Sequence, residues 1–167
     1  MAWDYRVLTP ADQPAWRALR LEALDAFPFA FLTTVEEQRT RAASEDRKFL
    51  ANGNWRGLFS SADDLIGMAA LIPFSATAAR HRMQLGAVYI SQPHWGSGAA
   101  QKLVDDVEAE AKRKGALQLE LSVSSENPRA IRFYERNGFE RVGVEPRAII
   151  VDGRGVDDFA YVKFLDT

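Results

Sequence analysis

The sequence is most strongly constrained near its middle, where an apolar strand, a glycine-rich turn, a helix and a second strand follow one another. Residues 83–91 are almost continuously apolar, which predicts a strand covered on both faces, and Gly86 predicts a bulge in it. Residues 98–114 have apolar positions at helical spacing and a basic last turn before Gly115. Residues 117–123 alternate between apolar and polar side chains, which predicts a strand with one buried face. This order predicts a parallel crossover unit.

Outside this unit the patterns predict a mixture of helices and strands. Three further helices are expected, at residues 10–26, 34–50 and 127–137. Five further strands are expected, at residues 3–8, 55–60, 65–74, 139–151 and 156–165. The connections at residues 61–64 and 152–155 have the composition of antiparallel hairpin turns. The length of 167 residues, with no repeat or linker, predicts a single domain over residues 1–167.

Composition excludes several classes of function. Lys and Arg number 21 against 23 Asp and Glu, so the net charge of −2 provides no positive field for a nucleic acid partner. The chain has no Cys, which excludes disulfides, thiolate nucleophiles and iron–sulfur clusters. Its two His, His81 and His94, predict no dedicated metal site. Early charges at Asp4 and Arg6, and apolar runs too short to span a bilayer, predict a cytoplasmic protein without a membrane partner.

The turn before the long helix is the candidate binding site. It reads Trp95-Gly96-Ser97-Gly98-Ala99-Ala100, and it lies where free backbone N–H groups and the positive end of a helix dipole converge. Such a turn binds anions, although it can also be only a tight connection. Gln101 stands where a dinucleotide-binding turn needs its third small residue, and the phosphate-loop sequence Gly-Lys-Ser/Thr is absent. NAD and ATP are therefore not expected as ligands.

Two linked motifs carry a family resemblance. The segment from Tyr89 to Ala100, followed by that from Asn127 to Phe139, resembles the GNAT superfamily of acyl-CoA N-acyltransferases. The resemblance extends over nearly the whole chain, but only residues 83–139 are diagnostic. It implies a GNAT-like α+β fold: a central, mixed but mostly antiparallel sheet of about seven strands with four helices, in an α/β three-layer sandwich. Such domains often pair through their C-terminal strands, so a homodimer is compatible with the resemblance.

The resemblance implies acetyl-CoA as co-substrate and no metal. The pyrophosphate would rest on backbone N–H groups, and the pantetheine arm would pair with the strand before the turn as an added strand does. The implied cofactor-binding residues are Val88, Tyr89, Ile90, Trp95, Gly96, Ser97, Gly98, Ala99, Ala100, Gln101, Asn127 and Tyr134. Trp95 departs from the family, which usually has Arg or Gln there, so we expect weaker or altered CoA binding rather than its loss.

The same resemblance assigns catalytic roles. Asn127 would hold the CoA arm, and Tyr134, two helical turns later, would be the general acid that protonates the departing thiolate. A plain N-cap and an apolar helix face are the competing interpretations of these two residues. Glu120 and His81 are candidate bases, acting directly or through water, against the simpler readings of a solvated Glu and a loop His.

The implied function is transfer of an acetyl group from acetyl-CoA to a primary amine by direct attack on the thioester. The acceptor, either a small molecule or a protein amine, is left open. The candidate lining residues of its cleft are Phe27, Phe29, Phe31, Arg147, Phe159 and Tyr161. Two alternatives are a non-catalytic CoA-sensing or interaction module with the same fold and an N-acyltransferase that uses a longer acyl donor.

Overall fold

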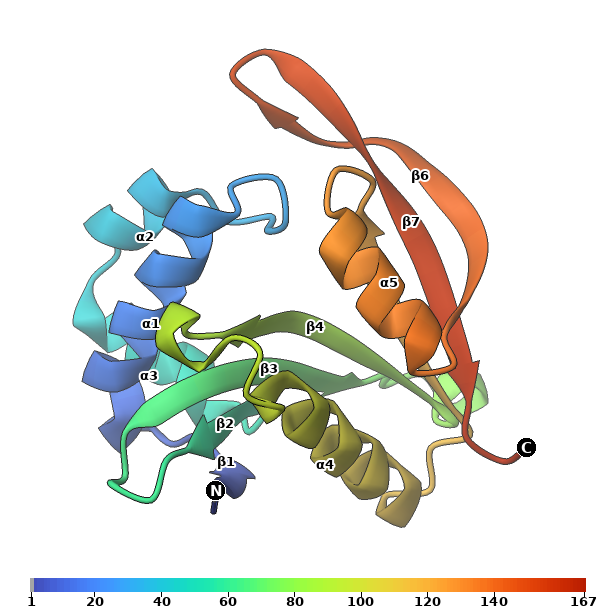
Figure 1. The fold of residues 1–167 in the computed structure, drawn as a ribbon, viewed down its shortest axis with the longest axis horizontal. Coiled ribbons are helices and arrows are strands. Elements are labelled where there is room, and N and C mark those ends of the chain that lie inside the picture. Colours follow the sequence, from blue (N-terminus) through green and yellow to red (C-terminus); the bar gives the residue numbers. More distant parts are fainter. Residues whose placement is uncertain (1) are drawn as a thin grey trace.

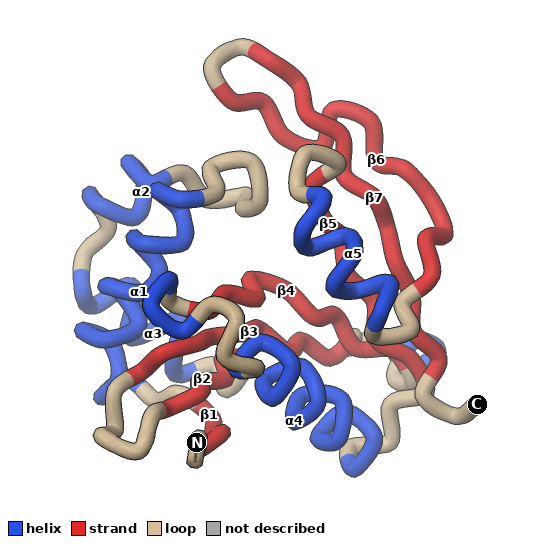
Figure 2. The backbone as a smooth tube through the Cα atoms, viewed as in Figure 1, coloured by secondary structure: helices blue, strands red, loops and turns tan. Residues whose placement is uncertain are grey.

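A computed structural model describes residues 2–167 as seven strands in one sheet together with five α-helices (Figures 1 and 2). The strands are β1 (Asp4–Val7), β2 (Trp55–Phe59), β3 (Leu65–Pro73), β4 (Arg82–Ile90), β5 (Gln118–Ser124), β6 (Glu140–Val151) and β7 (Arg154–Phe164). The helices are α1 (Gln13–Ala26), α2 (Val35–Thr40), α3 (Ala43–Ala51), α4 (Ala99–Arg113) and α5 (Pro128–Arg136). The sheet order is β1-β2-β3-β4-β5-β7-β6.

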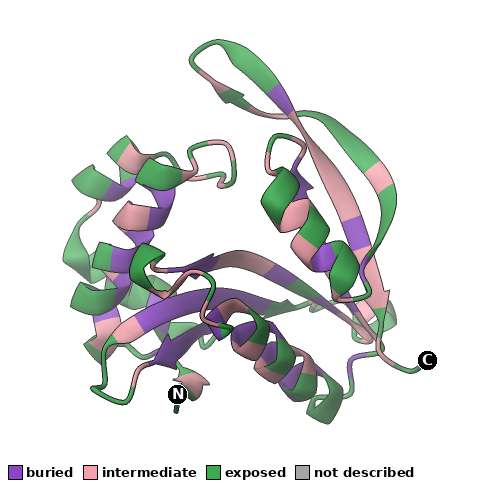
Figure 3. Cartoon of the chain, viewed as in Figure 1, coloured by how far each residue is buried: buried purple, intermediate pink, exposed green. Residues whose placement is uncertain are grey.

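Helices cover both faces of the sheet. Neighbouring residues of a strand point to opposite faces, so Met68 and Ala69 of β3 belong to different clusters. Met68 packs with residues of α1 and α3, whereas Ala69 packs with the apolar face of α4. Figure 3 shows the resulting burial along β2 and β3. The predicted mixed α+β sheet with seven strands is confirmed.

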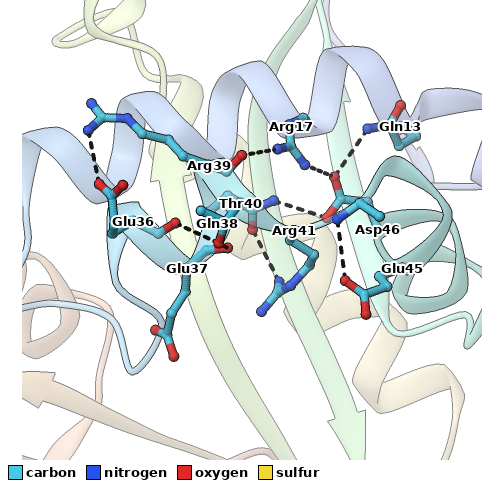
Figure 4. Close-up of polar contacts among 11 residues, drawn as sticks. Gln13, Arg17, Glu36, Glu37, Gln38, Arg39, Thr40, Arg41, Glu45 and Asp46 are labelled. Atoms are coloured by element: carbon cyan, nitrogen blue, oxygen red, sulfur yellow. Dashed lines mark hydrogen bonds and ion pairs between the residues drawn. The ribbon is translucent and has the colours of Figure 1, made fainter.

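The helix count was predicted wrongly, because the expected helix at residues 34–50 is two helices. The chain turns extended at Arg41, where ψ is 135°, and α3 begins after Ala42. The fully buried carboxylate of Asp46 accepts a hydrogen bond from Gln38 Nε2 at 3.0 Å (Figure 4). In one continuous helix these residues, eight apart, would be separated by about 12 Å along the axis. The break brings them together.

The bulge expected near Gly86 is present in β4. Met68 lies opposite Tyr89 and Ala70 lies opposite Gly86, so the two residues Ala87 and Val88 face the single residue between Met68 and Ala70. Ala87 has a φ of +49°, which is uncommon for a residue with a side chain. The bulge bends β4 just before its C-terminal end.

The crossover from β4 through α4 to β5 is parallel, as predicted, but its two strands pair only briefly. Arg82, Met83 and Gln84 lie opposite residues 118–120, and beyond them β5 is paired only with β7. The edge of β4 from Leu85 to Ile90 is therefore open toward β5. We call this opening the notch. Separately, no helix between residues 2 and 167 combines the length and the apolar character needed to cross a membrane.

Candidate functional site

A cavity of about 370 Å³ lies where the end of β4, the turn before α4 and the helix α5 meet. Sixteen residues from these elements and from the end of α1 line it. They are Phe27, Val88, Tyr89, Ile90, His94, Trp95, Gly96, Gly98, Ala100, Gln101, Asn127, Arg129, Ala130, Phe133, Tyr134 and Arg136. The structure thus brings together most of the residues that the two sequence motifs indicated.

Four amides of the turn and of the start of α4 have no hydrogen-bond partner in the described structure. The Ser97 amide donates to the His94 carbonyl at 3.3 Å, and the Ala99 amide donates to the Ser97 hydroxyl at 3.3 Å, so both are used locally. Within residues 2–167 no hydrogen bond is formed by the amides of Gly96, Gly98, Ala100 and Gln101. These four residues line the cavity, whereas the other two do not.

Backbone conformation explains the two glycines of the turn. Gly96 has a φ of +74° and Gly98 a φ of +93°, both in the left-handed region that side chains disfavour. Gly98 is also the residue that precedes the first turn of α4, where the dipole is positive. The result is a concave row of amides suited to an anion.

The open edge of β4 forms a second wall. The Ser91 amide donates to Ile66 of β3 at 2.8 Å. The Ile90 carbonyl belongs to the same trans peptide unit and therefore points the opposite way, into the notch. An extended ligand that carries amide groups can pair with such an edge as an added strand does.

The third wall is α5, which begins and ends with predicted site residues. Asn127 caps the helix by accepting a hydrogen bond from the Ala130 amide at 3.1 Å, and it also lines the cavity. Tyr134 is 8% exposed, and burial raises the pKa of its phenol. No hydrogen bond among residues 2–167 involves its hydroxyl. The phenol therefore keeps its proton at neutral pH.

Two arginines of the cavity were missed at the sequence level. Arg129 and Arg136 both lie on α5 and both line the cavity, and none of the lining residues from the described part of the chain is acidic. Their spacing of seven residues equals that between Asn127 and Tyr134, which was the available signal. The cavity is positively charged on this side.

The two predicted bases lie outside this cavity. Glu120 accepts hydrogen bonds from Arg82 Nε at 2.8 Å and Nη2 at 2.9 Å, in the short stretch where β4 and β5 are paired. His81 precedes β4, so the strand separates it from Ile90 by roughly 30 Å at about 3.3 Å per residue. Neither residue is among those that meet Tyr134 at the cavity.

The candidate acceptor residues are scattered. Phe27 lines the cavity, and the Arg154 guanidinium lies 4.9 Å from the Phe29 ring. Phe31 packs beneath Arg20, which lies 5.4 Å from its ring. Three more are placed on β6 and β7: Arg147 is exposed, Phe159 lies under Arg141, and Tyr161 is 1% exposed in the core.

The amide row, the open strand edge and the basic helix face together suit an extended ligand with an anionic end. Comparison with known proteins agrees. The model of the acetyltransferase (GNAT) family matches residues 16–139. The chain belongs to the GNAT family of acetyltransferases.

The relatives and solved structures bear on the fold. An uncharacterized N-acetyltransferase of Mycobacterium bovis is 34% identical over 83 residues, which cover 50% of this chain and 52% of the relative. The chain thus spans about half the length of the curated relatives it matches. The yncA protein of Salmonella typhimurium, solved with its cofactor acetyl-CoA, is 20% identical with a TM-score of 0.83, over 100% of this chain and 96% of that one. A GNAT-family acetyltransferase of Streptococcus pneumoniae is 21% identical with a TM-score of 0.80, over 98% and 99%. The predicted GNAT-like fold is confirmed.

Proposed function

We propose that this protein transfers an acetyl group from acetyl-CoA to a primary amine. One observation carries the proposal: the residues whose amides lack a hydrogen-bond partner also line the cavity. They are Gly96, Gly98, Ala100 and Gln101. Family membership and the acetyl-CoA named with the Salmonella typhimurium structure support the choice of donor.

The donor groups of the cavity fit the parts of CoA. The amide row receives the pyrophosphate, and Arg129 and Arg136 supply positive charge for its phosphates. The open edge of β4 receives the amides of the pantetheine arm. When bound, acetyl-CoA supplies an activated acyl group.

The reaction forms one C–N bond and breaks one C–S bond. The neutral amine attacks the thioester carbonyl, and main-chain N–H groups near the bulge at Val88 stabilise the oxyanion. Tyr134 donates a hydrogen bond to the departing sulfur, and the proton that the attacking nitrogen loses passes through water to that sulfur, so CoA leaves as a thiol. A thiol has a pKa of about 8.5, which is below the pKa of this buried phenol. The phenol therefore keeps its proton and stabilises the departing thiolate mainly by the hydrogen bond.

The amine must lose a proton before it attacks. Deprotonating a lysine-type amine, with a pKa of about 10.4, costs roughly 4.6 kcal/mol of free energy at pH 7. Deprotonating an α-amine costs only about 1 kcal/mol. Because Glu120 is held by Arg82, we assign the proton to water in the notch. Glu120 and His81 lie outside the cavity and take no part in this step.

The test compares two glycine substitutions of equal backbone strain. Gly96→Ala and Gly115→Ala each place a side chain at positive φ, +74° and +85°, and neither added Cβ meets an atom within 4 Å. Both should cost about 1–2 kcal/mol of stability. Only Gly96 lies in the cavity, so only Gly96→Ala should weaken acetyl-CoA binding in titration calorimetry.

Turnover is tested by thiol release with a panel of amines and with acetyl-, propionyl- and succinyl-CoA. Release of CoA that requires an amine and is fastest with acetyl-CoA supports the proposal. Tight binding without release would replace it by the CoA-sensing alternative, and a preference for a longer acyl group would replace acetyl as the donor. Absence of acetyl-CoA binding at millimolar concentration would contradict it altogether.

A further inference from the structure

Trp95 stands where the family usually has Arg or Gln, and its side chain forms a hydrogen bond with the main chain of β4. Its indole Nε1 donates to the Ile90 carbonyl at 2.6 Å. That carbonyl is the one that points into the notch, because the Ser91 amide of the same peptide unit is bonded to β3. The indole therefore occupies a main-chain acceptor on the open edge of β4.

The ring of Trp95 also joins the two sides of the cavity. On the α5 side, the Arg129 guanidinium lies 4.7 Å from the ring centroid. On the α1 side, the ring of Phe27 lies 6.0 Å away, and Phe27 in turn lies 6.2 Å from Tyr89 of β4. Phe27 is the residue that ends α1 and begins the loop toward α2. Trp95 thus bridges α1 and α5 beside the strand edge.

From this geometry we infer that Trp95 sets donor affinity by holding, with its indole N–H, the place on β4 that an amide of the pantetheine arm takes. The inference rests on the proposed function. Donor binding exchanges one hydrogen bond to Ile90 for another and turns the indole away from Arg129 and Phe27. Arg129 is then free to pair with a phosphate, and the start of the α1–α2 loop loses its contact with the turn.

This exchange makes a prediction that depends on which part of the ligand is present. Adenosine 3′,5′-bisphosphate carries phosphates but has no pantetheine arm, so it has no group that competes for the Ile90 carbonyl. CoA carries both parts. Removal of the indole N–H should therefore strengthen the binding of CoA and leave that of adenosine 3′,5′-bisphosphate unchanged.

The experiment measures both ligands on the wild-type protein and on Trp95→Phe, which keeps a ring and removes the donor. We expect the variant to bind CoA about two- to tenfold more tightly, the range that the net contribution of one hydrogen bond allows. Binding of adenosine 3′,5′-bisphosphate should stay within about twofold of the wild type. A circular dichroism spectrum and thermal midpoint like those of the wild type establish that the variant is folded.

A second measurement does not depend on affinity. The fluorescence difference between the wild type and Trp95→Phe isolates Trp95 from the other three Trp residues. Saturating CoA should shift that emission to the red, and adenosine 3′,5′-bisphosphate should not. Phe27→Leu, which weakens the contact with the ring, should also tighten CoA binding. Phe29→Leu, on the same loop but against Arg154, should not.

The outcomes separate the two proposals. Equal or weaker CoA binding by Trp95→Phe, or an emission that CoA leaves unshifted, would overturn the exchange at Ile90 while the acetyltransferase proposal stands. Failure of the wild type and the variant alike to bind CoA would overturn both.

Discussion

Tyr134 is the residue whose environment bears most directly on the chemistry. Because burial raises the pKa of its phenol, the hydroxyl remains protonated through the pH range in which amines become neutral. Tyr134→Phe should lower kcat by about 10²- to 10⁴-fold and leave acetyl-CoA affinity within a few-fold. Stopped-flow thiol release and calorimetry measure the two quantities. A variant with unchanged kcat on the alkaline limb of the pH profile would exclude a role of the Tyr134 hydroxyl in the departure of the thiolate.

Glu120, a candidate base from the sequence, is held in an ion pair with Arg82 outside the cavity. Its two oxygens are engaged by Arg82, whose side chain is 37% exposed against 18% for Glu120. Glu120→Gln should leave kcat within about twofold and cost less than about 1 kcal/mol of unfolding free energy, as half-exposed ion pairs do. Steady-state kinetics and urea unfolding test this. A large loss of kcat with an unchanged thermal midpoint would restore Glu120 as the base.

The residues of the site differ in how far the sequence could predict them. The amide row, Asn127 and Tyr134 follow from two local motifs, because turn conformation and helix spacing are local properties. Arg129 lines the cavity because of where α5 lies relative to the turn before α4. A local sequence pattern does not contain this information. Similarly, alternation in β5 assigns Glu120 to a face but does not reveal that Arg82 meets it there.

At the scale of elements, α1, α2 and α3 are held together by a buried polar cluster. Asp46 is fully buried and accepts hydrogen bonds from Gln13 at 3.1 Å, Arg17 at 2.6 Å and Gln38 at 3.0 Å (Figure 4). Helical propensity favours continuing through residues 34–50, and this tertiary cluster overrides it. This is why the strands and the helices α1, α4 and α5 were predictable and the division of residues 34–50 into α2 and α3 was not.

Asp46→Ala should destabilise the fold strongly, because it leaves the amides of Gln13 and Gln38 and the charge of Arg17 without their shared acceptor. We expect a loss of about 3 kcal/mol in unfolding free energy by urea denaturation. Asp25→Ala is the matched control, since Asp25 is 76% exposed and lies 3.9 Å from Arg39. It should cost less than about 0.5 kcal/mol. Equal losses in the two variants would mean that the cluster does not hold the helices.

Across the whole molecule, α4 is tied to β1 and β2 by one acidic residue. Burial acts to raise the pKa of Glu110, but hydrogen bonds from Arg56 and Tyr5 lower it to about 2. A carboxyl with a lowered folded-state pKa stabilises the fold above its ordinary value of 4.5, and this contribution is lost as the pH falls toward 2. The lowering corresponds to about 3 kcal/mol.

Urea unfolding between pH 6 and pH 2 should therefore show a difference between the wild type and Glu110→Gln that shrinks steadily below pH 4.5. The sign follows from proton binding, because the unfolded state takes up the proton first. A difference that is constant over this range would show that Glu110 is not held ionised by Arg56 and Tyr5.

A cluster around Arg154 joins three segments that lie far apart in the sequence. Arg154, at the start of β7, forms an ion pair with Glu126 before α5, and its guanidinium lies 4.9 Å from the ring of Phe29 after α1. Two of these segments, the loop after α1 and the last hairpin, belong to the parts of the chain that the family resemblance implies at the acceptor cleft. The pair is exposed, 54% for Arg154 and 38% for Glu126, so its contribution to stability is small.

Arg154→Ala should therefore change the unfolding free energy by less than about 1 kcal/mol. It should also leave CoA affinity unchanged and raise KM for the amine, because the loops around the acceptor lose their common contact. Arg39→Ala is matched in exposure, also 54%, and pairs with Asp25 and Glu36 away from this contact. If both variants leave KM for the amine unchanged, the contact at Arg154 has no role in acceptor binding. The residues of the cavity beside Phe27 would then be the place to look for the acceptor site.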